Sequence, residues 1–346
     1  MRPARLLGVL LAGLSLPALA GTEPADWLVR MSEASRAANY QGVIIYRARD
    51  TMETMKVVHR FQDGVELERV LTQTGVPREI IKQDGRVICL LPQDRKLTVE
   101  RPTPKGLFPG LTVERVAQIA QIYGFEDLGT ARVAGRSCRG IAVVPRDEYR
   151  YGYEIWADEV TGVPLKVNLV GRGGAVLEQM MFTEVDFPAR IPDVALQSEL
   201  DPKRVAGAVT RLIPAPATTP TAIAAGQPAA AGGRFSRLPP GFRVTLRDVR
   251  PTADGKGMVE HLVLSDGLSA VSVFSARREV PARVFQGVSQ MGAVHAYGRM
   301  QGTMHITVMG EAPPETVRLI GESLRPEPEP AAATAATALP AAGGRP

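Results

Sequence analysis

The sequence predicts an α+β protein whose larger part is one curved antiparallel sheet, a half-barrel with its helices on a single face. Short runs rich in β-branched and aromatic residues recur through residues 40–185, separated by Asp-Gly and Thr-Gly turn signals. Only two stretches of that part have helical spacing. About ten strands for two helices favour a single large sheet. A smaller α+β unit is predicted toward the C-terminus.

The first twenty residues have the pattern of a secretory signal peptide. Arg2 and Arg5 precede the apolar run from Leu6 to Leu16, and an Ala-x-Ala pattern ends at Ala20. A bilayer span needs about 20 apolar residues, more than this run contains. We therefore expect cleavage after Ala20 and export of the mature chain to the periplasm.

The larger unit is expected over residues 22–200, after this signal peptide (1–20). A helix begins at Pro24, where Trp27, Leu28 and Met31 recur at helical spacing. The strands that follow are predicted in GVIIYRA, TMKVVHRF, VELERVL, PREIIK, RVICLL and KLTVE. A second helix is predicted in LTVERVAQIAQIYG, with Val113, Val116, Ala120 and Tyr123 on one side. Four more strands are predicted in SCRGIAVVP, YRYGYEIWAD, VPLKVNLV and AVLEQMMFTEV.

Alternation along the last strands of this unit suggests an apolar groove. The candidate lining residues are Tyr149, Tyr151, Tyr153 and Ile155 on one strand, Val163, Leu165, Val167 and Leu169 on the next, and Met180 and Met181. Adaptable apolar side chains of this kind suit acyl chains. The alternative is that they pack beneath the two helices as ordinary core.

The chain has two cysteines, Cys89 and Cys138, each within a strand-like run. An exported protein meets an oxidising compartment, which favours a disulfide between them. Such a bridge would close a loop of about 50 residues and contribute about 4 kcal/mol in the chain-entropy model. The alternative is two separately buried thiols.

Charge and motifs exclude several classes of function. Removal of Arg2 and Arg5 lowers the formal net charge from +5 to +3, and no long basic run is present, so nucleic acid is not expected as a partner. The sequence has no P-loop, no Gly-x-Ser-x-Gly and no zinc-ligand spacing. No cofactor or metal is expected, and the protein is not expected to be an enzyme.

Composition divides the rest of the chain into a linker, a second unit and a tail. Residues 201–233 are rich in Ala, Pro, Thr and Gly and are predicted to be a linker. The second unit is expected over residues 234–324, and the similarly biased residues 325–346 are predicted to be a disordered tail.

A serine, an acid and a histidine lie close together in the second unit, in the run around SDGLSAVSVF. An Asp266-Gly267 type I′ turn would make this run a hairpin with His261 opposite Ser272. Ser265 would then lie at the turn, about 13 Å from His261, which is too far for a nucleophile and its base. We therefore interpret the run as a hairpin and not as a hydrolytic site.

A second hairpin is predicted around a Gln301-Gly302 turn, and it places His295 and His305 on opposite faces of the sheet. They cannot therefore ligate one metal together. The unit closes with a helix begun by Pro314, and about four strands packed on this helix are expected.

At this point a family resemblance is specific. MSEASRAANYQGVIIYR, RDEYRYGYEIWADEVTGVPLKVNL, EHLVLSDGLSAVSVF and TVMGEAPPETVRLIGESL resemble segments of the RseB/MucB family, which consists of periplasmic negative regulators of sigma-E (AlgU-type) factors. The match spans nearly the whole mature chain and occurs in the family's order.

The resemblance implies a binding protein. Members of the RseB/MucB family bind the periplasmic segment of a membrane-anchored RseA/MucA-like anti-sigma factor and shield it from the site-1 protease. It also implies a LolA/LolB-like half-barrel that senses lipopolysaccharide or lipoprotein acyl chains, and a C-terminal anti-sigma-binding domain. A homo-oligomer is a further expectation.

The surface that contacts the anti-sigma segment is predicted from the possibility that an extended peptide adds to an exposed strand edge. The candidates lie in the first hairpin and its neighbour: His261, Leu262, Val271, Ser272, Val273, Phe274, His295, Tyr297 and Arg299. Three alternatives stay open at this stage: a periplasmic lipoprotein or lipid carrier, a hydrolase that would need His261, and a structural envelope protein.

Overall fold

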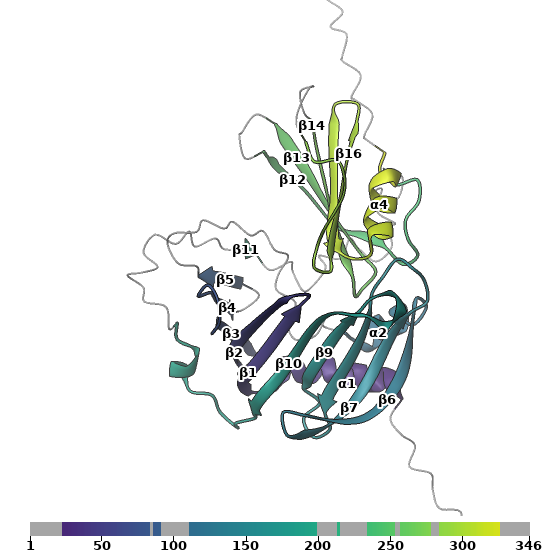
Figure 1. Ribbon diagram of the computed structural model, residues 1–346. Helices are drawn as coiled ribbons and strands as arrows, with labels where there is room; N and C mark the ends of the chain where they lie inside the picture. The colour runs from purple at the N-terminus through teal and green to yellow at the C-terminus, as the bar shows by residue number, and fades with distance from the viewer. Residues whose placement is uncertain are drawn as a thin grey trace, which may run out of the picture.

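The computed structural model describes residues 23–83, 86–90, 111–198, 213–214, 234–252, 257–277 and 284–325. Two antiparallel sheets dominate this part of the chain, and the predicted fold class is confirmed. Figure 1 shows the larger sheet curving across the N-terminal part and the smaller sheet standing on one end of it. The predicted signal peptide (1–20) and the predicted strand KLTVE lie outside the described residues. The same holds for the predicted tail apart from Arg325 and for the predicted linker apart from residues 213–214.

The larger sheet has 11 strands in the order β11-β5-β4-β3-β2-β1-β10-β9-β8-β7-β6. Its first five strands are β1 (Tyr40–Ala48), β2 (Thr51–Gln62), β3 (Val65–Thr72), β4 (Glu79–Gln83) and β5 (Arg86–Leu90). The others are β6 (Tyr123–Val133), β7 (Arg136–Pro145), β8 (Gly152–Asp158), β9 (Pro164–Val170), β10 (Val176–Asp186) and β11 (Ile213–Pro214). Two short 3₁₀ turns are η1 (Arg172–Gly174) and η2 (Asp193–Leu196). β1 pairs with β10, which joins the two ends of the meander.

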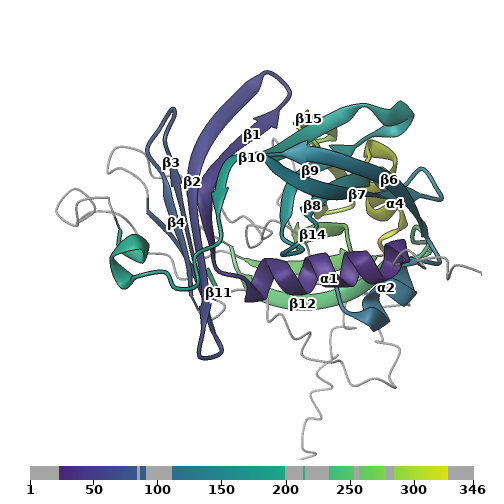
Figure 2. The ribbon, with the colours of Figure 1, turned by 90° about the horizontal axis from the view of Figure 1, so that it is seen from below.

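Helix α1 (Pro24–Ala37) crosses the concave face of the larger sheet, as Figure 2 shows from below. Trp27, Leu28 and Met31 are buried there, so the predicted helical face is confirmed. Helix α2 (Val113–Ile119) is preceded by the N-cap residue Thr112, whose hydroxyl accepts a hydrogen bond from the amide of Arg115. The two helices cover one end of the concave face and form a common core with β7, β8 and β9.

The second predicted helix was drawn too long. It ends at Ile119, and Tyr123, which was placed on its apolar side, instead begins β6. Val113 also differs from the prediction, because its side chain is 65% exposed. The prediction extended the helix into β6 because this strand lacks the alternation by which a strand is recognised. β6 is a terminal strand with a bulge at Asp127 and a run of exposed residues.

The smaller sheet has six strands in the order β12-β13-β14-β17-β16-β15, against about four predicted. Its strands are β12 (Arg243–Pro251), β13 (Met258–Ser265), β14 (Ala270–Arg277), β15 (Gly287–Met291), β16 (Val294–Gln301) and β17 (Met304–Glu311). Helix α4 (Pro314–Ser323) packs on one face, and Val317, Ile320 and Leu324 turn inward as predicted. The two strands that were not predicted, β12 and β15, are the edges of this sheet.

Both hairpins of the smaller sheet are present, with a register two residues from the predicted one. Ser265 pairs with Ala270, and His261 pairs with Phe274, so the first turn has four residues instead of two. The cause is Asp266, whose Oδ1 accepts the amides of Leu268 and Ser269 at 2.9 and 2.8 Å and so widens the turn. A shift of two keeps each side chain on its predicted face.

In the second hairpin Gln301 pairs with Met304, so the turn is Gly302-Thr303 and not Gln301-Gly302. His295 pairs with Gly310, and His305 pairs with Met300. The two histidines therefore lie on opposite faces, as predicted. The described residues contain no cluster of His, Cys, Asp and Glu that could hold a metal ion.

The predicted disulfide is absent, because Cys138 is a free, buried thiol. Cys89 belongs to β5 and Cys138 to β7, and seven strands lie between these two in the sheet. At about 4.8 Å per strand this separation is far beyond the reach of a disulfide. Burial raises the pKa of the Cys138 thiol to about 11, which keeps it protonated.

None of the described helices combines the length and the apolar character that a membrane crossing requires.

Candidate functional site at the junction of the two sheets

The two units meet through a fully buried ion pair. Arg150 precedes β8 in the larger unit, and Asp266 lies in the β13–β14 turn of the smaller one. Arg150 Nη1 is 2.6 Å from Asp266 Oδ2, and both side chains are 0% exposed. Tyr123 at the start of β6 donates its hydroxyl to the same carboxylate at 3.1 Å. Asp266 thus binds both its own turn and two groups of the other unit.

The guanidinium of Arg150 is held by both units. Its Nε and Nη2 donate to Asp147 at 2.8 and 2.9 Å within the larger unit. Its Nη2 also donates at 2.6 Å to the carbonyl of Pro240, which belongs to the smaller unit. Burial, followed by the negative charge of Asp266, raises the pKa of Tyr123 well above its usual range. The phenol therefore acts as a hydrogen-bond donor at this node.

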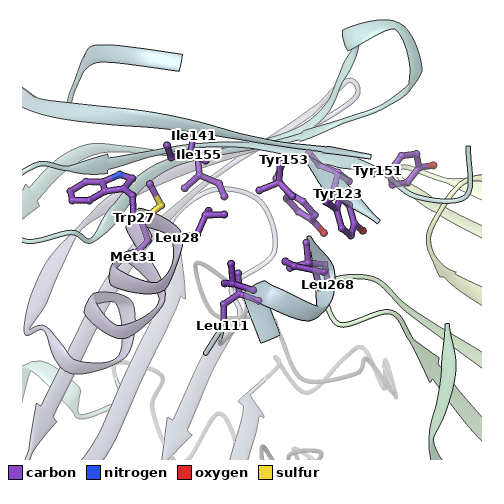
Figure 3. Close-up of a cluster of buried hydrophobic side chains, with 14 of the residues drawn as sticks. Trp27, Leu28, Met31, Leu111, Tyr123, Ile141, Tyr151, Tyr153, Ile155 and Leu268 are labelled. Atoms are coloured by element: carbon purple, nitrogen blue, oxygen red, sulfur yellow. The ribbon is translucent and has the colours of Figure 1, made fainter. Parts of the chain in front are cut away.

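The junction continues through apolar side chains. Leu268, from the same turn as Asp266, is 4% exposed and belongs to the core cluster of the larger unit. Figure 3 shows Leu268 pointing toward Tyr123 and Tyr153. Ala293, between β15 and β16, also joins this cluster at 1% exposure. The smaller unit therefore completes the core of the larger one.

The turn approaches α2 so closely that it needs a glycine. Gly267 has φ +108°, and a Cβ at this position would lie 3.0 Å from Cγ2 of Ile119. Any larger residue at this position would therefore strain the backbone of the turn and press on Ile119.

Two of the predicted site residues, one from each unit, meet at the junction. The hydroxyl of Tyr151 lies 3.2 Å from Nδ1 of His295, which also lies 2.9 Å from the carbonyl of Ala312. Burial, and then the carboxylates of Glu311 and Glu315, raise the pKa of Tyr151 to about 12.

Most of the predicted groove residues are packed as core. Tyr151, Tyr153, Ile155 and Leu169 belong to the cluster beneath α1 and α2, and Val167 packs against it. Val163 and Leu165 are fully buried in the neighbouring cluster around Phe182. The packing beneath the helices that was considered as the alternative is therefore what the structure shows. The two strands begin later in the chain than predicted: Tyr149 and Tyr151 precede β8, and Val163 precedes β9.

Met180 and Met181 were predicted to line one groove, and this is wrong for one of them. They pair with Val167 and Lys166 in a regular stretch of β9 and β10, so their side chains point to opposite faces. Met180 shares the concave face with Val167, and Met181 shares the convex face with Lys166. A groove on the concave side can therefore include only Met180.

A polar cluster occupies the other end of the concave face. His59 is 0% exposed, stacks on Tyr40 with ring centroids 4.6 Å apart, and has its Nδ1 2.8 Å from the carbonyl of Ala38. Its Nε2 lies 3.5 Å from Glu66, which also accepts from Lys82 at 2.6 Å. The contacts with His59 and Lys82 lower the pKa of Glu66 to about 2.

This lowered pKa predicts a specific loss of stability in acid. A carboxylate whose pKa falls on folding stabilises the protein above its unfolded pKa and loses that contribution as the pH falls through the folded value. For Glu66 the window runs from 4.5 to about 2, and with solvent screening of this partly exposed carboxylate the contribution is about 1–2 kcal/mol. Urea unfolding at several pH values should show that Glu66→Gln removes this part of the pH dependence. Equal slopes for the variant and the parent between pH 4.5 and 2.5 would contradict it.

The anti-sigma contact candidates separate into two sets. Leu262, Val271 and Val273 are 0–1% exposed in the core under α4, so they cannot contact a partner on the surface. His261, Ser272 and Phe274 lie on the opposite, open face, where His261 stacks on Phe274 and its Nε2 is 3.0 Å from the Ser272 hydroxyl. Tyr297 and Arg299 face α4, and Arg299 donates to the carbonyls of Gly321 and Leu324 at 2.8 and 3.0 Å.

The predicted addition of a peptide strand to the first hairpin or its neighbour is wrong in its location. β13, β14 and β16 each have a strand on both sides, so none of them has a free edge. The edges of the smaller sheet are β12 and β15. On β12 the side chains of Leu246 and Val249 are 44% and 50% exposed, with the exposed Arg243 and Arg247 nearby.

The residues that sequence reasoning missed are those that build the junction: Tyr123, Arg150, Asp266 and Leu268. Asp266 was assigned to a two-residue hairpin turn, and turns are normally solvated. The only local sign of a special role for Arg150 is that this charged residue lies between two tyrosines.

Within the described residues, two units share a core and one face of the smaller sheet is covered by no helix, an arrangement that suits a binding protein with two units. Family models for the MucB/RseB N-terminal domain and the MucB/RseB C-terminal domain match residues 23–200 and 227–325. The chain therefore belongs to the MucB/RseB family, a family of regulatory binding proteins and not of enzymes.

Similar proteins cover nearly the whole chain. The sigma factor AlgU regulatory protein MucB of Pseudomonas aeruginosa is 32% identical over 94% of this chain and 98% of its own. The sigma-E factor regulatory protein RseB of Escherichia coli K12 is 26% identical over 92% of this chain and 96% of its own. The structure of the P. aeruginosa MucA/MucB complex matches with a TM-score of 0.69 at 29% identity, covering 88% of this chain and 99% of that one.

Proposed function

We propose that this protein is a periplasmic regulator that binds the periplasmic segment of a MucA/RseA-like anti-sigma factor and shields it from site-1 protease. On binding a lipid-like signal, lipopolysaccharide or lipoprotein acyl chains, it releases the segment. The observation that carries the proposal is the match of both units, in order, to a MucB chain whose structure is that of a complex with MucA. The signal-peptide pattern of the first twenty residues supports a periplasmic location.

Binding of the lipid and binding of the anti-sigma segment are thermodynamically linked in this proposal. A ligand that binds the free regulator more tightly than the complex must weaken binding of the anti-sigma segment by the same factor. A coupling of about 2 kcal/mol changes the affinity about thirtyfold. The junction supplies a physical connection, because Tyr151 of the larger unit and His295 of the smaller one are in contact.

The test is proteolysis of the purified anti-sigma periplasmic segment by its site-1 protease, with and without the mature protein. We expect about tenfold or greater protection at saturating regulator, reversed by titration of lipopolysaccharide or a lipopeptide. Absence of binding and protection by a folded protein would contradict the regulatory function. Lipid binding without protection would instead support the lipid-carrier alternative.

For the contact surface we propose the open face of the smaller sheet, around His261, Ser272 and Phe274. Met309 pairs with Ser272 on that face and is 40% exposed, so it can carry a charge without entering a core. We expect Met309→Glu to weaken binding of the anti-sigma segment about tenfold or more, because a carboxylate at the centre of an interface is desolvated without a partner.

The matched control is Met52→Glu, at an exposed methionine of the larger unit (63% exposed). Isothermal titration of both variants, with thermal unfolding to verify the fold, gives the comparison. Equal affinities of the two variants would exclude this face as the contact surface.

A further inference from the structure

The turn formed by Asp266–Ser269 has the chemistry of a small anionic amphiphile. Its polar end is the Asp266 carboxylate, which receives Arg150 Nη1 at 2.6 Å and the Tyr123 hydroxyl at 3.1 Å. Its apolar end is Leu268, buried in the cluster that contains Leu111, Tyr123 and Tyr153 (Figure 3). The larger unit thus holds an anion and an aliphatic side chain side by side, both supplied by the smaller unit.

Withdrawal of the turn would leave a complementary vacancy in the larger unit. Arg150 would keep Asp147 but lose Asp266 and the carbonyl of Pro240, both of which come from the smaller unit. The Tyr123 hydroxyl would lose its acceptor, and the apolar residues around Leu268 would lose their cover. Arg150 Nη1 and the Tyr123 hydroxyl would then be buried donors that have lost their acceptor, although Asp147 still balances part of the charge. Buried donors without an acceptor are unfavourable, so this state favours entry of water or of another anion.

We infer that the Asp266–Ser269 turn occupies an amphiphile site of the larger unit, so that an anionic head group at Arg150 and Tyr123, with an acyl chain in place of Leu268, competes with docking of the smaller unit. This inference rests on the proposed lipid response and gives it a location and a mechanism. The ligand acts by separating the units, because one position cannot hold both the turn and the ligand. Loss of the docked arrangement then changes the surface that the anti-sigma segment meets.

The competition is tested by fixing the two units together. Arg172 and Glu315 face each other across the junction, with 3.7 Å between Nη1 and Oε1 and side chains 65% and 42% exposed. In a chain that carries Cys89→Ala and Cys138→Ala, the substitutions Arg172→Cys and Glu315→Cys provide two thiols that a short bis-maleimide can join. The same protein before cross-linking is the control.

The probe is lysophosphatidylglycerol, with an alkyl maltoside of equal chain length and inorganic phosphate as further arms. We expect the cross-linked protein to bind the lysolipid about tenfold or more weakly than the unlinked protein, and to keep the anti-sigma segment when the lysolipid is added. Equal lysolipid affinity before and after cross-linking would overturn the inference. If the uncharged maltoside bound as tightly as the lysolipid, the anionic head group would have no part in binding. If phosphate alone displaced the turn, the acyl chain would have no part in it.

A single substitution tests the same inference without a cross-link. Asp266→Asn keeps Oδ1 as the acceptor for the turn amides but removes the charge opposite Arg150. Because the docked state alone is weakened, we expect the lysolipid affinity to rise about fivefold to tenfold. Unchanged or lowered affinity would contradict the competition.

Asp158→Asn is the matched control for this substitution. Asp158 is also buried, accepts the amide of Thr161 at 2.7 Å and pairs with Arg136 at 2.7 Å, but all these partners lie within the larger unit. We expect no change in its lysolipid affinity. Failure of the unlinked parent protein to bind any lipid would instead contradict the proposed function itself, which separates the two outcomes.

Discussion

Replacing Arg150 with methionine is expected to lower the free energy of unfolding by about 3–5 kcal/mol, because it leaves the Asp266 carboxylate buried without a counter-charge. The pair is 0% exposed on both sides, so solvent cannot take the place of the lost partner. Asp147 and Pro240 lose their donor as well. Urea unfolding followed by circular dichroism measures the change.

The same substitution should also divide the unfolding transition. The parent is expected to unfold as one cooperative unit, because Leu268 and Ala293 of the smaller unit belong to the core of the larger one. In Arg150→Met the two units should unfold in separate calorimetric transitions. A single transition at the parent temperature would show that the ion pair does not couple the units.

Two further variants make this prediction specific. Arg150→Met combined with Asp266→Asn should recover part of the loss, since the buried charge is removed together with its partner while Oδ1 still accepts the turn amides. Arg172→Met removes an exposed arginine that bridges Glu148 and Glu315 at 3.1 and 3.7 Å across the same junction. We expect this exposed pair to contribute only about 0–1 kcal/mol.

The parts of the fold that sequence predicts are those with a regular local pattern. Trp27, Leu28 and Met31 recur at helical spacing and are all buried in α1. Helix α4 shows the same agreement at Val317 and Ile320. Patterns of this kind depend only on which face of one element meets the core, so they can be recognised without knowledge of the partner.

The edges of the sheets could not be predicted in the same way. β6, β12 and β15 are terminal strands with many exposed residues. They lack the alternation of apolar and polar residues by which a strand is recognised in a sequence. Cys89 and Cys138 illustrate the same limit over a longer range. Their strand-like surroundings are correct, but the strand order that separates them is a property of the whole sheet and not of either segment.

The candidate site depends on contacts between residues far apart in the chain. Arg150 and Asp266 are 116 positions apart, and nothing local distinguishes this aspartate from an ordinary turn residue. Sequence placed Tyr151 and His295 in two separate candidate sites, and the structure brings their side chains together at 3.2 Å. A site formed by two units therefore becomes visible only when both are folded.

A second buried arginine pair provides the contrast that separates stability from coupling. Arg69 on β3 donates its Nε to Glu79 on β4 at 2.5 Å, and the two side chains are 3% and 0% exposed. Arg69 also donates to the carbonyl of Ala195 in η2, and Ser198 donates to Glu79. All of these partners belong to the larger unit, so through these contacts the pair joins β3, β4 and the segment around η2.

Arg69→Met is therefore expected to lower the free energy of unfolding by about 3–5 kcal/mol, as in the junction, because the buried Glu79 carboxylate would lose the cation that lies 2.5 Å from it. Since Glu79 and Ala195, the partners of Arg69 named above, both belong to one unit, the variant should unfold in a single transition at a lower temperature and keep its affinity for the anti-sigma segment. The neighbouring Arg78, paired with Glu53 at 2.8 Å and 29% exposed, is the control, and Arg78→Met should cost about 0–1 kcal/mol. If Arg69→Met divided the transition as Arg150→Met does, coupling between the units would not depend on the junction pair, and the two-unit mechanism would lose its physical basis.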